Sequence, residues 1–304
     1  MQNNETKSAF IAIVGKPNVG KSSLLNAIIK SKVTIVSKKP QTTRTRITGI
    51  YNENENQIVF LDTPGLLKPK NRLGDYMVDA VQQSIAMVDA AVLVVEAGSE
   101  ISYADKELTE RFKHLDLPAI LVINKIDKIE NKEDIALDIM RFASLYDFDA
   151  IVPVSALDGN GIKDLRNELL KQCLPGEHFF ADDEITDQPD YVLTSEVIRE
   201  KMLRLLDREV PHGVAVVIDT FGMRDDADIL DVDATIICEK SNHKGIIIGK
   251  GGEMLKKIGT LSRIDLEKFF DCKVSLKLWV KVKEDWRNRP NLLIDYGYDK
   301  RNFD

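Results

Sequence analysis

The first 172 residues alternate short apolar runs with longer amphipathic stretches. The apolar runs lie at 9–14, 57–61, 90–95, 119–123 and 150–154. They lack the polar alternation of half-exposed strands, so they predict strands buried on both faces, and the stretches between them predict the covering helices. This order is typical of a doubly wound α/β domain with a mostly parallel sheet. Ligands bind such a domain at the carboxyl ends of its strands.

The pattern changes after residue 174. The next residues are rich in acidic side chains, include two prolines and show no apolar period, which indicates a linker over 175–193. An apolar stripe over 195–209 predicts a helix with Thr194 or Ser195 as its N-cap. Strands are expected at 214–219, 229–238 and 273–282, with two helices joined by a glycine-rich break before the last strand. These elements predict a smaller α+β domain over 194–304, after a first domain over 1–174.

Composition agrees with two globular domains. The chain has 304 residues, of which 43% are hydrophobic and 30% charged, and a domain averages roughly 150 residues. Its apolar runs, such as 90–95, are far shorter than the ~20 residues that a membrane span needs. The start MQNNETKS has neither a basic segment nor an apolar one, and Cys173, Cys238 and Cys272 are widely spaced. We therefore expect a cytoplasmic protein with reduced cysteines in its core and no zinc site.

The charge is unevenly distributed. The chain carries a net charge of −7, yet residues 241–290 hold twelve Lys and Arg against six Asp and Glu. An acidic chain repels nucleic acid, so this basic segment is either a phosphate-binding patch or a solvated helix face. Charge alone leaves both interpretations open.

A phosphate-binding loop follows the first predicted strand. Gly15, Gly20, Lys21 and Ser22 match the pattern GxxxxGK[ST], and a helix with an apolar stripe follows. The loop N–H groups and the helix N-terminus then converge on an anion. Lys21 is expected to reach the β- and γ-phosphates, and the Ser22 hydroxyl to ligate Mg²⁺.

Two further segments are expected to sense the γ-phosphate. Asp62 and Gly65 belong to DTPG, which ends a strand, so Asp62 can hold Mg²⁺ through a water and the Gly65 N–H can reach the γ-phosphate. The polar segment 38–46 is expected to be a mobile loop that carries the last Mg²⁺ ligand. We expect that ligand to be Thr43, with Thr42 as the alternative.

The base is predicted to be guanine. Asn124, Lys125 and Asp127 belong to NKID, again at a strand end. A carboxylate can accept both the N1 and N2 donors of guanine, whereas adenine lacks the N1 donor and would leave Asp127 unpaired. Asn124 is expected at the other edge of the base, and Lys125 along its ring. The N–H of Ala156, within SAL at 155–157, is expected to bond O6.

Together these motifs resemble the translation-factor class of P-loop GTPases over residues 9–172. The resemblance implies catalysis by Lys21, Thr43, Asp62 and Gly65. The predicted nucleotide contacts are Gly15, Lys16, Pro17, Asn18, Val19, Gly20, Lys21, Ser22, Ser23, Asp62, Thr63, Pro64, Gly65, Asn124, Lys125, Asp127, Ser155, Ala156 and Leu157.

A leucine follows DTPG where the class often has a glutamine that positions the attacking water. The apolar side chain of Leu66 cannot hydrogen-bond water, so a slow enzyme is expected. In relatives with this replacement, an asparagine of the phosphate loop helps bind K⁺ in place of an arginine finger, and Asn18 matches that asparagine. The alternative is that Asn18 merely tolerates the tight loop.

The basic segment contains a second glycine loop. Gly249, Lys250, Gly251 and Gly252 match the GxxG loop of a KH domain of the second topological type, which clamps single-stranded nucleic acid. The predicted RNA contacts are Lys244, Ile248, Gly249, Lys250, Gly251, Gly252, Lys256 and Lys257. Farther on, WVKVKEDWR places Trp279 and Trp286 among basic residues. This stretch could stack bases and neutralise phosphates, or it could be an edge strand with a core tryptophan. We expect Trp279 in the core and Trp286 to be the more open of the two.

A GTPase of this class followed by a linker and a KH domain resembles the Era family of bacterial GTPases over nearly the whole chain. The resemblance implies a monomeric GTP/GDP switch whose KH domain binds near the 3′ end of the 16S ribosomal RNA and which assists assembly of the small ribosomal subunit. It also implies peripheral association with the inner membrane. The alternative is a passive RNA-binding module whose nucleotide site is not coupled to RNA.

Overall fold

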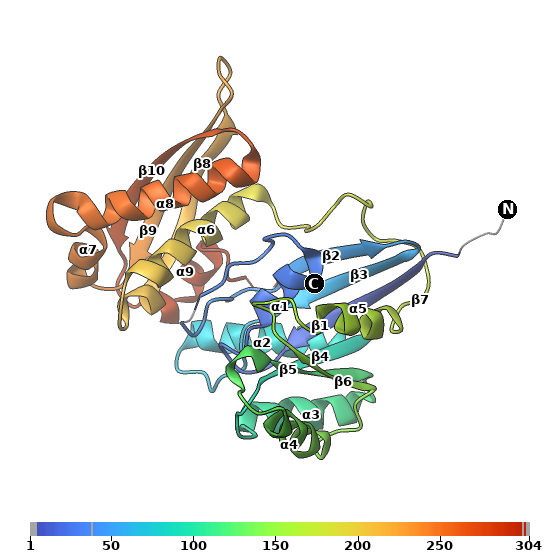
Figure 1. Cartoon of the computed structure of the whole chain (residues 1–304). Coiled ribbons are helices and arrows are strands. Elements are labelled where there is room, and N and C mark those ends of the chain that lie inside the picture. Colours follow the sequence, from blue (N-terminus) through green and yellow to red (C-terminus); the bar gives the residue numbers. More distant parts are fainter. Residues whose placement is uncertain (1–4, 38, 300, 302–304) are drawn as a thin grey trace.

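Two lobes make up the molecule, joined by an extended segment (Figure 1). The computed structural model describes residues 5–37, 39–299 and 301. Residues 1–4, Lys38, Lys300 and 302–304 lie outside the described residues. Predictions for the first four residues, for Lys38 of the segment 38–46 and for the end of the C-terminal tail are therefore not tested.

The first lobe is built on one mostly parallel sheet. Its strands run in the order β2-β3-β1-β4-β5-β6, and a short β7 pairs antiparallel with β1. The bounds are β1 (Lys7–Val14), β2 (Ile47–Glu53), β3 (Asn56–Asp62), β4 (Ala90–Glu96), β5 (Ala119–Asn124), β6 (Ala150–Val154) and β7 (Leu174–Pro175). All five predicted strands are confirmed. The sequence analysis missed β2, which pairs antiparallel with β3 at the edge of the sheet.

Helices cover both faces of this sheet and make two separate cores. They are α1 (Lys21–Ile29), α2 (Arg72–Ala86), α3 (Tyr103–Leu115), α4 (Lys132–Ala143) and α5 (Ile162–Leu170), with a short η1 (Ile126–Lys128). Buried residues of α1 and α5 pack on one face of the sheet, and those of α2 and α3 on the other. Since every predicted strand then has apolar neighbours on both sides, its near-continuous apolar sequence is explained.

The second lobe has the order expected of a KH domain. It contains α6 (Asp190–Leu205), η2 (Val210–Gly213), β8 (Val214–Met223), β9 (Ile229–Cys238), α7 (Ser241–Ile248), η3 (Lys250–Gly252), α8 (Glu253–Phe270), β10 (Lys273–Val282), η4 (Trp286–Asn288) and α9 (Pro290–Asp295). The sheet order is β10-β9-β8, with β10 parallel and β8 antiparallel to β9. Apolar residues of α6, α7 and α8 form the core against this sheet. Across the described residues, no helix is long and apolar enough to cross a membrane.

The linker prediction needs correction at its end. Helix α6 begins at Asp190 with Pro189 as its N-cap, so residues 190–193 belong to the helix and Thr194 and Ser195 lie inside it. Proline suits a helix start because its fixed φ matches the helix and it has no N–H to satisfy.

The rest of the linker packs against the first lobe. The ring of Phe179 contacts that of Phe10 edge-on, with centroids 4.7 Å apart. The Gln57 side chain accepts from the Phe179 N–H at 2.7 Å, and the Ile50 N–H donates to the Ile185 carbonyl at 2.9 Å. These contacts tie the linker to β1, β2 and β3.

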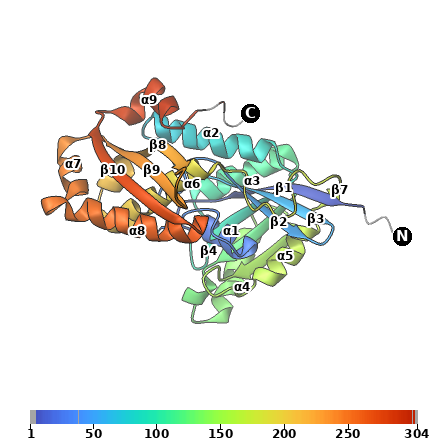
Figure 2. The ribbon, with the colours of Figure 1, turned by 90° about the horizontal axis from the view of Figure 1, so that it is seen from above.

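The prediction for the two tryptophans was wrong in both cases. Trp279 is 63% exposed, because its side chain lies on the face of β10 away from the KH helices. Trp286 is fully buried in η4. It lies in an apolar cluster with Tyr298 of the C-terminal segment and with Leu73 and Met77 of α2. Figure 2 shows α9 and α2 on the same side of the molecule, where this cluster joins the two lobes.

Candidate nucleotide and nucleic-acid sites

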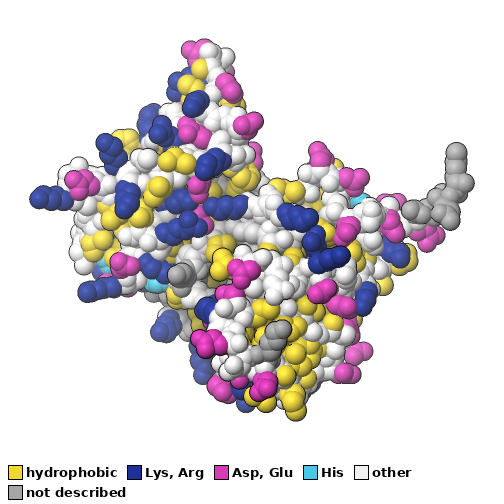
Figure 3. All heavy atoms as spheres, in the orientation of Figure 1, with side chains coloured by type: hydrophobic (Ala, Val, Ile, Leu, Met, Phe, Trp, Pro, Cys, Tyr) yellow, Lys and Arg dark blue, Asp and Glu magenta, His cyan; other side chains and the backbone are white. Residues whose placement is uncertain are grey.

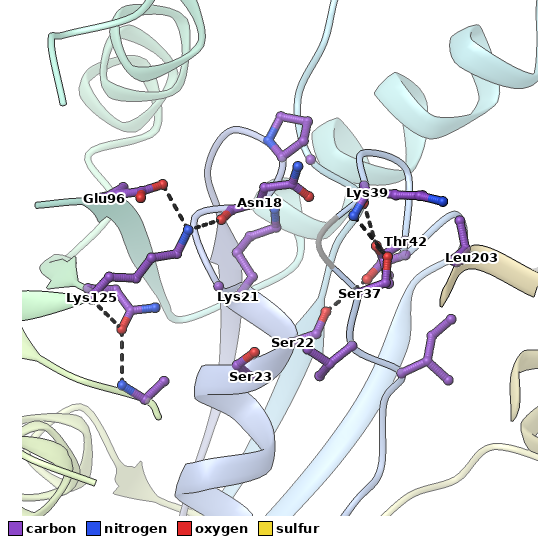
Figure 4. Close-up of a pocket in the computed structure, with 18 of the residues that line it drawn as sticks. Asn18, Lys21, Ser22, Ser23, Ser37, Lys39, Thr42, Glu96, Lys125 and Leu203 are labelled. Carbon is purple, nitrogen blue, oxygen red and sulfur yellow. Dashed lines mark hydrogen bonds and ion pairs between the residues drawn. The ribbon is translucent and has the colours of Figure 1, made fainter. Parts of the chain in front are cut away.

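The phosphate loop lies between β1 and α1, as predicted. The Lys21 ammonium donates to the carbonyls of Gly15 and Lys16, at 3.2 Å each, so its head lies within the loop (Figure 4). Burial lowers the pKa of Lys21 to about 8, against an opposing effect of Asp62. A buried ammonium with few counter-charges is a strong site for an anion, because bound phosphate would restore the charged form.

Three oxygen-bearing side chains gather beside this loop. The Ser22 hydroxyl donates to Asp62 Oδ2 at 2.7 Å and lies 2.9 Å from Thr43 Oγ1. Asp62 Oδ1 is buried and has no hydrogen-bond partner among the described residues. Burial raises the pKa of Asp62, although Lys21 opposes that shift. Hydroxyl and carboxylate oxygens suit Mg²⁺, and a bound cation would both pair the free oxygen and favour the carboxylate.

The two candidate threonines are placed differently. Thr43 is buried and its hydroxyl lies 3.4 Å from Asp62 Oδ2. The Thr42 hydroxyl instead donates to the Lys39 carbonyl at 2.7 Å. The geometry therefore favours Thr43 as the Mg²⁺ ligand. Sequence reasoning missed Thr34, whose hydroxyl also donates to Asp62 Oδ2, at 3.3 Å.

The DTPG segment lies directly against the phosphate loop. The Thr63 hydroxyl donates to the Ile13 carbonyl at 2.8 Å. A Cβ added to Gly65 would lie 2.6 Å from Pro17, so the close approach of these two segments requires glycine. Leu66 donates from its N–H to the Gly15 carbonyl at 3.2 Å and buries its side chain in the sheet core. Its apolar side chain therefore contributes to the core and cannot hydrogen-bond an attacking water.

The base-binding motifs contact one another and the phosphate loop. The Asn124 amide donates to the Val19 carbonyl at 2.8 Å and accepts from the Ala156 N–H at 3.1 Å. Asp127 is exposed and accepts from the Ser155 hydroxyl at 2.7 Å. These bonds bring NKID and SAL together at the mouth of the loop, as the sequence analysis predicts.

The lysine of NKID is held by a residue that sequence reasoning missed. The Lys125 ammonium bonds the Asn18 carbonyl and pairs with Glu96 at 2.8 Å (Figure 4). Glu96 also pairs with Lys128 at 2.8 Å. Leu157, a predicted nucleotide contact, lies 82% exposed at the rim.

A cavity of about 1020 Å³ joins all of these motifs. It is lined by the phosphate loop, by residues 35–37, 39 and 41–43, and by NKID and SAL. Leu203, Arg204 and Asp207, from α6 and the residues that follow it, complete the wall, and Figure 4 shows Leu203 beyond Thr42. The second lobe therefore contributes to the nucleotide cavity, which no sequence motif indicates.

The second glycine loop joins α7 to α8. Gly249 has φ +73°, and a Cβ there would lie 2.7 Å from Met254. Gly251 and Gly252 have φ +60° and +84°, and an added Cβ would meet no atom within 4 Å. The backbone at Gly249 therefore packs closely against Met254, whereas Gly251 and Gly252 face open space where a nucleic-acid backbone can approach.

The predicted basic contacts surround this loop. Lys250, Lys256 and Lys257 are exposed and Lys244 is half-buried, as is Ile248. Figure 3 shows Lys and Arg side chains along the face of the second lobe that carries α8. Of the two interpretations of the basic segment, a phosphate-binding patch fits this arrangement.

Comparisons with known proteins match both domains. The model of the family described as "50S ribosome-binding GTPase" matches residues 10–125, and the KH domain model matches residues 209–287. GTPase Era of Ruminiclostridium cellulolyticum is 47% identical over 292 residues, which cover 96% of this chain and 97% of that protein. The chain belongs to the Era family of GTPases. It is thus a GTP-hydrolysing enzyme with a C-terminal KH domain. GTPase Era of Clostridioides difficile is 46% identical over 97% of this chain and 99% of its own.

Solved Era structures have the same fold. A variant of Aquifex aeolicus Era bound to GDP·AlF4⁻ superposes with a TM-score of 0.93 at 42% identity, and covers 96% of this chain and 99% of its own. An Era complex with MgGDPNP and nucleotides 1506–1542 of 16S ribosomal RNA matches with the same TM-score, identity and coverage. The predicted fold, a P-loop GTPase domain followed by a KH domain, is confirmed.

Proposed function

We infer that this Era-family chain is a GTP-controlled RNA-binding switch that holds the 3′ end of 16S ribosomal RNA and assists assembly of the small ribosomal subunit. One observation carries the coupling. The segment 39–46 contributes Thr43 to the oxygen cluster beside the phosphate loop, while its neighbour Arg44 donates to the Val214 carbonyl of the KH domain at 2.5 Å. A change that moves Thr43 therefore acts on the second domain. The RNA in the solved Era complex supports the choice of RNA.

The residue roles of this proposal follow the geometry. Lys21 pairs with the β- and γ-phosphates, and the oxygens of Ser22 and Thr43 would hold Mg²⁺, with Asp62 holding it through a water. When bound, that ion neutralises charge on the phosphates and draws Thr43 toward them. Gly65 presents its N–H to the γ-phosphate. The motifs NKID and SAL select guanine, and the GxxG loop with its lysines clamps RNA.

We also propose that K⁺ accelerates hydrolysis through Asn18. One observation supports it: the Leu66 side chain is buried in the sheet core and offers no polar group to an attacking water. The φ of +65° at Asn18 fits the alternative, in which Asn18 tolerates the tight loop. In this proposal a bound cation stabilises the transition state of hydrolysis, which other enzymes stabilise with a polar side chain. Phosphate release should be several times faster in KCl than in NaCl at matched ionic strength, and equal rates would remove the role of K⁺.

Three further parts belong to the proposal. A monomeric state and peripheral association with the inner membrane rest on the family resemblance, whereas a cytoplasmic location rests on the sequence features described above. The proposed domains are residues 1–174 and a second domain that begins with α6 at Asp190. Sedimentation of the purified chain and its partition between soluble and membrane fractions test the first two.

The coupling is tested by single-turnover kinetics with a 16S 3′-end oligonucleotide. RNA should raise the rate of phosphate release, and a non-hydrolysable GTP analogue should tighten RNA binding relative to GDP. The double variant Lys250→Asp and Gly251→Asp is the matched control. It should lose RNA binding and the RNA response yet keep its GTP affinity, because both positions are exposed and distant from the phosphate loop. If RNA and nucleotide leave each other's binding unchanged in the natural chain, the passive-module alternative is correct.

A further inference from the structure

Arg199 of α6 enters the nucleotide domain next to Thr43. Its side chain is 1% exposed. One guanidinium nitrogen donates to the Gln41 carbonyl at 3.3 Å and another donates to the Thr42 carbonyl. A residue of the second domain thus holds the two peptide groups that directly precede Thr43.

A carboxylate of the same helix holds Arg199 in this position. Glu196 accepts from Arg199 Nε at 2.8 Å and from Nη2 at 2.5 Å. Burial disfavours the charge of Arg199, but Glu196 outweighs it and keeps the pKa of Arg199 above its usual value. Since the guanidinium is planar and held on two sides, it has little freedom left, which suits it to fix a backbone.

The residue after Thr43 is also bound to the second domain, but here the side chain belongs to the first domain and the backbone to the second. Arg44 is 1% exposed, and its guanidinium donates to the carbonyls of Val214 and His212 at 2.5 and 2.9 Å and to the Tyr298 hydroxyl at 3.2 Å. Arg44 therefore binds backbone of the KH domain, and Arg199 of the KH domain binds backbone of the segment that contains Arg44.

The start of the same segment is tied to the helix that carries Arg199. Glu200 has no exposed side-chain surface; it accepts from the Val36 N–H at 3.1 Å and pairs with Lys32 at 2.9 Å. Residues before and after Thr43 are thus bound to the second domain. The Thr43 hydroxyl itself stays in the first domain, 2.9 Å from Ser22.

A loop held at its ends has already lost most of the entropy that ligand binding would otherwise remove. We propose that Arg199 is a positioning residue for the Mg²⁺-binding threonine, supplied to the GTPase site by the KH domain of the same chain. Arg199 is not among the described residues that line the nucleotide cavity. It acts through the carbonyls of Gln41 and Thr42, and so sets where Thr43 Oγ1 lies. This inference rests on the proposed function and names the contact through which the two sites are coupled.

The test compares Arg199→Ala with Arg224→Ala in the full chain. Arg224 also pairs with a carboxylate, Asp231 at 2.6 Å, but lies in the β8–β9 hairpin away from the GTPase site. Affinity for GDP and for a GTP analogue, and the Mg²⁺ concentration for half-maximal single-turnover hydrolysis, are measured for each. Arg199→Ala should need about tenfold more Mg²⁺ and lose about tenfold in analogue affinity, whereas GDP affinity changes less than about twofold. Arg224→Ala should match the natural chain.

Two more variants separate positioning from a loss of folding. Arg199→Lys retains the charge and a single donor nitrogen in place of three, so it should restore part of the Mg²⁺ response. Glu196→Gln keeps the side-chain shape but loosens Arg199, and should shift the Mg²⁺ dependence in the same direction by a smaller factor. The inference is overturned if folded Arg199→Ala and Glu196→Gln variants keep the natural Mg²⁺ dependence and analogue-to-GDP ratio. A natural chain that neither responds to RNA nor binds it would refute the proposed function instead, whatever the variants do.

Discussion

Replacing Trp286 by alanine should destabilise the protein strongly, although the residue sits in a short, polar stretch near the end of the chain. Its ring is fully buried, stacks on Tyr298 with centroids 5.9 Å apart and meets Tyr296 edge-on at 5.6 Å. The indole N–H donates to the Gly213 carbonyl at 3.0 Å. One side chain thus links the C-terminal segment to the KH sheet and to α2 of the nucleotide domain.

The magnitude follows from burial and from the lost hydrogen bond. Truncating a buried aromatic ring to alanine costs about 3–5 kcal/mol, and leaving the Gly213 carbonyl unpaired adds on the order of 1 kcal/mol. The free energy of unfolding of a typical domain is about 5–15 kcal/mol, so this variant should lose a large part of it. Trp279→Ala is the matched control, because Trp279 is 63% exposed and a surface substitution changes stability by about 0.5 kcal/mol.

Urea denaturation followed by far-ultraviolet circular dichroism measures both variants without relying on tryptophan emission. Trp286→Ala should lower the urea midpoint clearly, and Trp279→Ala should leave it close to that of the natural chain. Trp286→Phe should fall between them, since it keeps a ring and loses the N–H donor. Equal midpoints for the two alanine variants, or a larger loss at Trp279, would refute the packing described for η4 and β10.

Three further predictions concern the nucleotide site. Asp127→Asn should reverse base preference by a factor on the order of 10² or more toward xanthosine triphosphate, and competition between the two nucleotides for the variant checks it; an unchanged preference would exclude Asp127 as the guanine contact. Gly65→Ala should lower GTP-analogue affinity about tenfold with little effect on GDP, because the added Cβ would lie 2.6 Å from Pro17 and would push away the N–H that is proposed to bind the γ-phosphate. Burial lowers the pKa of Lys21 to about 8, so the ammonium loses its proton as the pH rises through that value and no longer pairs with phosphate. Affinity for GTP should therefore fall about fivefold between about pH 7.5 and about pH 8.7, as measured by equilibrium titration, and a flat profile would contradict the lowered pKa.

The first domain was predictable because its signals are local. Strands buried on both faces are apolar throughout, whatever lies beside them, so all five apolar runs became strands. The phosphate loop, DTPG and NKID each follow such a run, and the carboxyl ends of parallel strands meet at one edge. Sequence order was then sufficient to bring Lys21, Asp62 and Asn124 together. The edge strand β2 lacks this signal, since half-exposed residues enter its sequence.

What the sequence determined by itself is therefore the presence of two phosphate-binding loops and the domains that carry them. The tertiary structure decided which surfaces those domains cover. Trp286 is buried because α2, far away in sequence, lies over it, and Trp279 is exposed because none of the helices that the structure describes covers that face of β10. Arg44 and Arg199 show no motif at all, since a guanidinium becomes a structural contact only when distant backbone carbonyls are brought within hydrogen-bond distance. Local patterns report how a segment folds, whereas contact between domains depends on shape and charge that many separated residues create together.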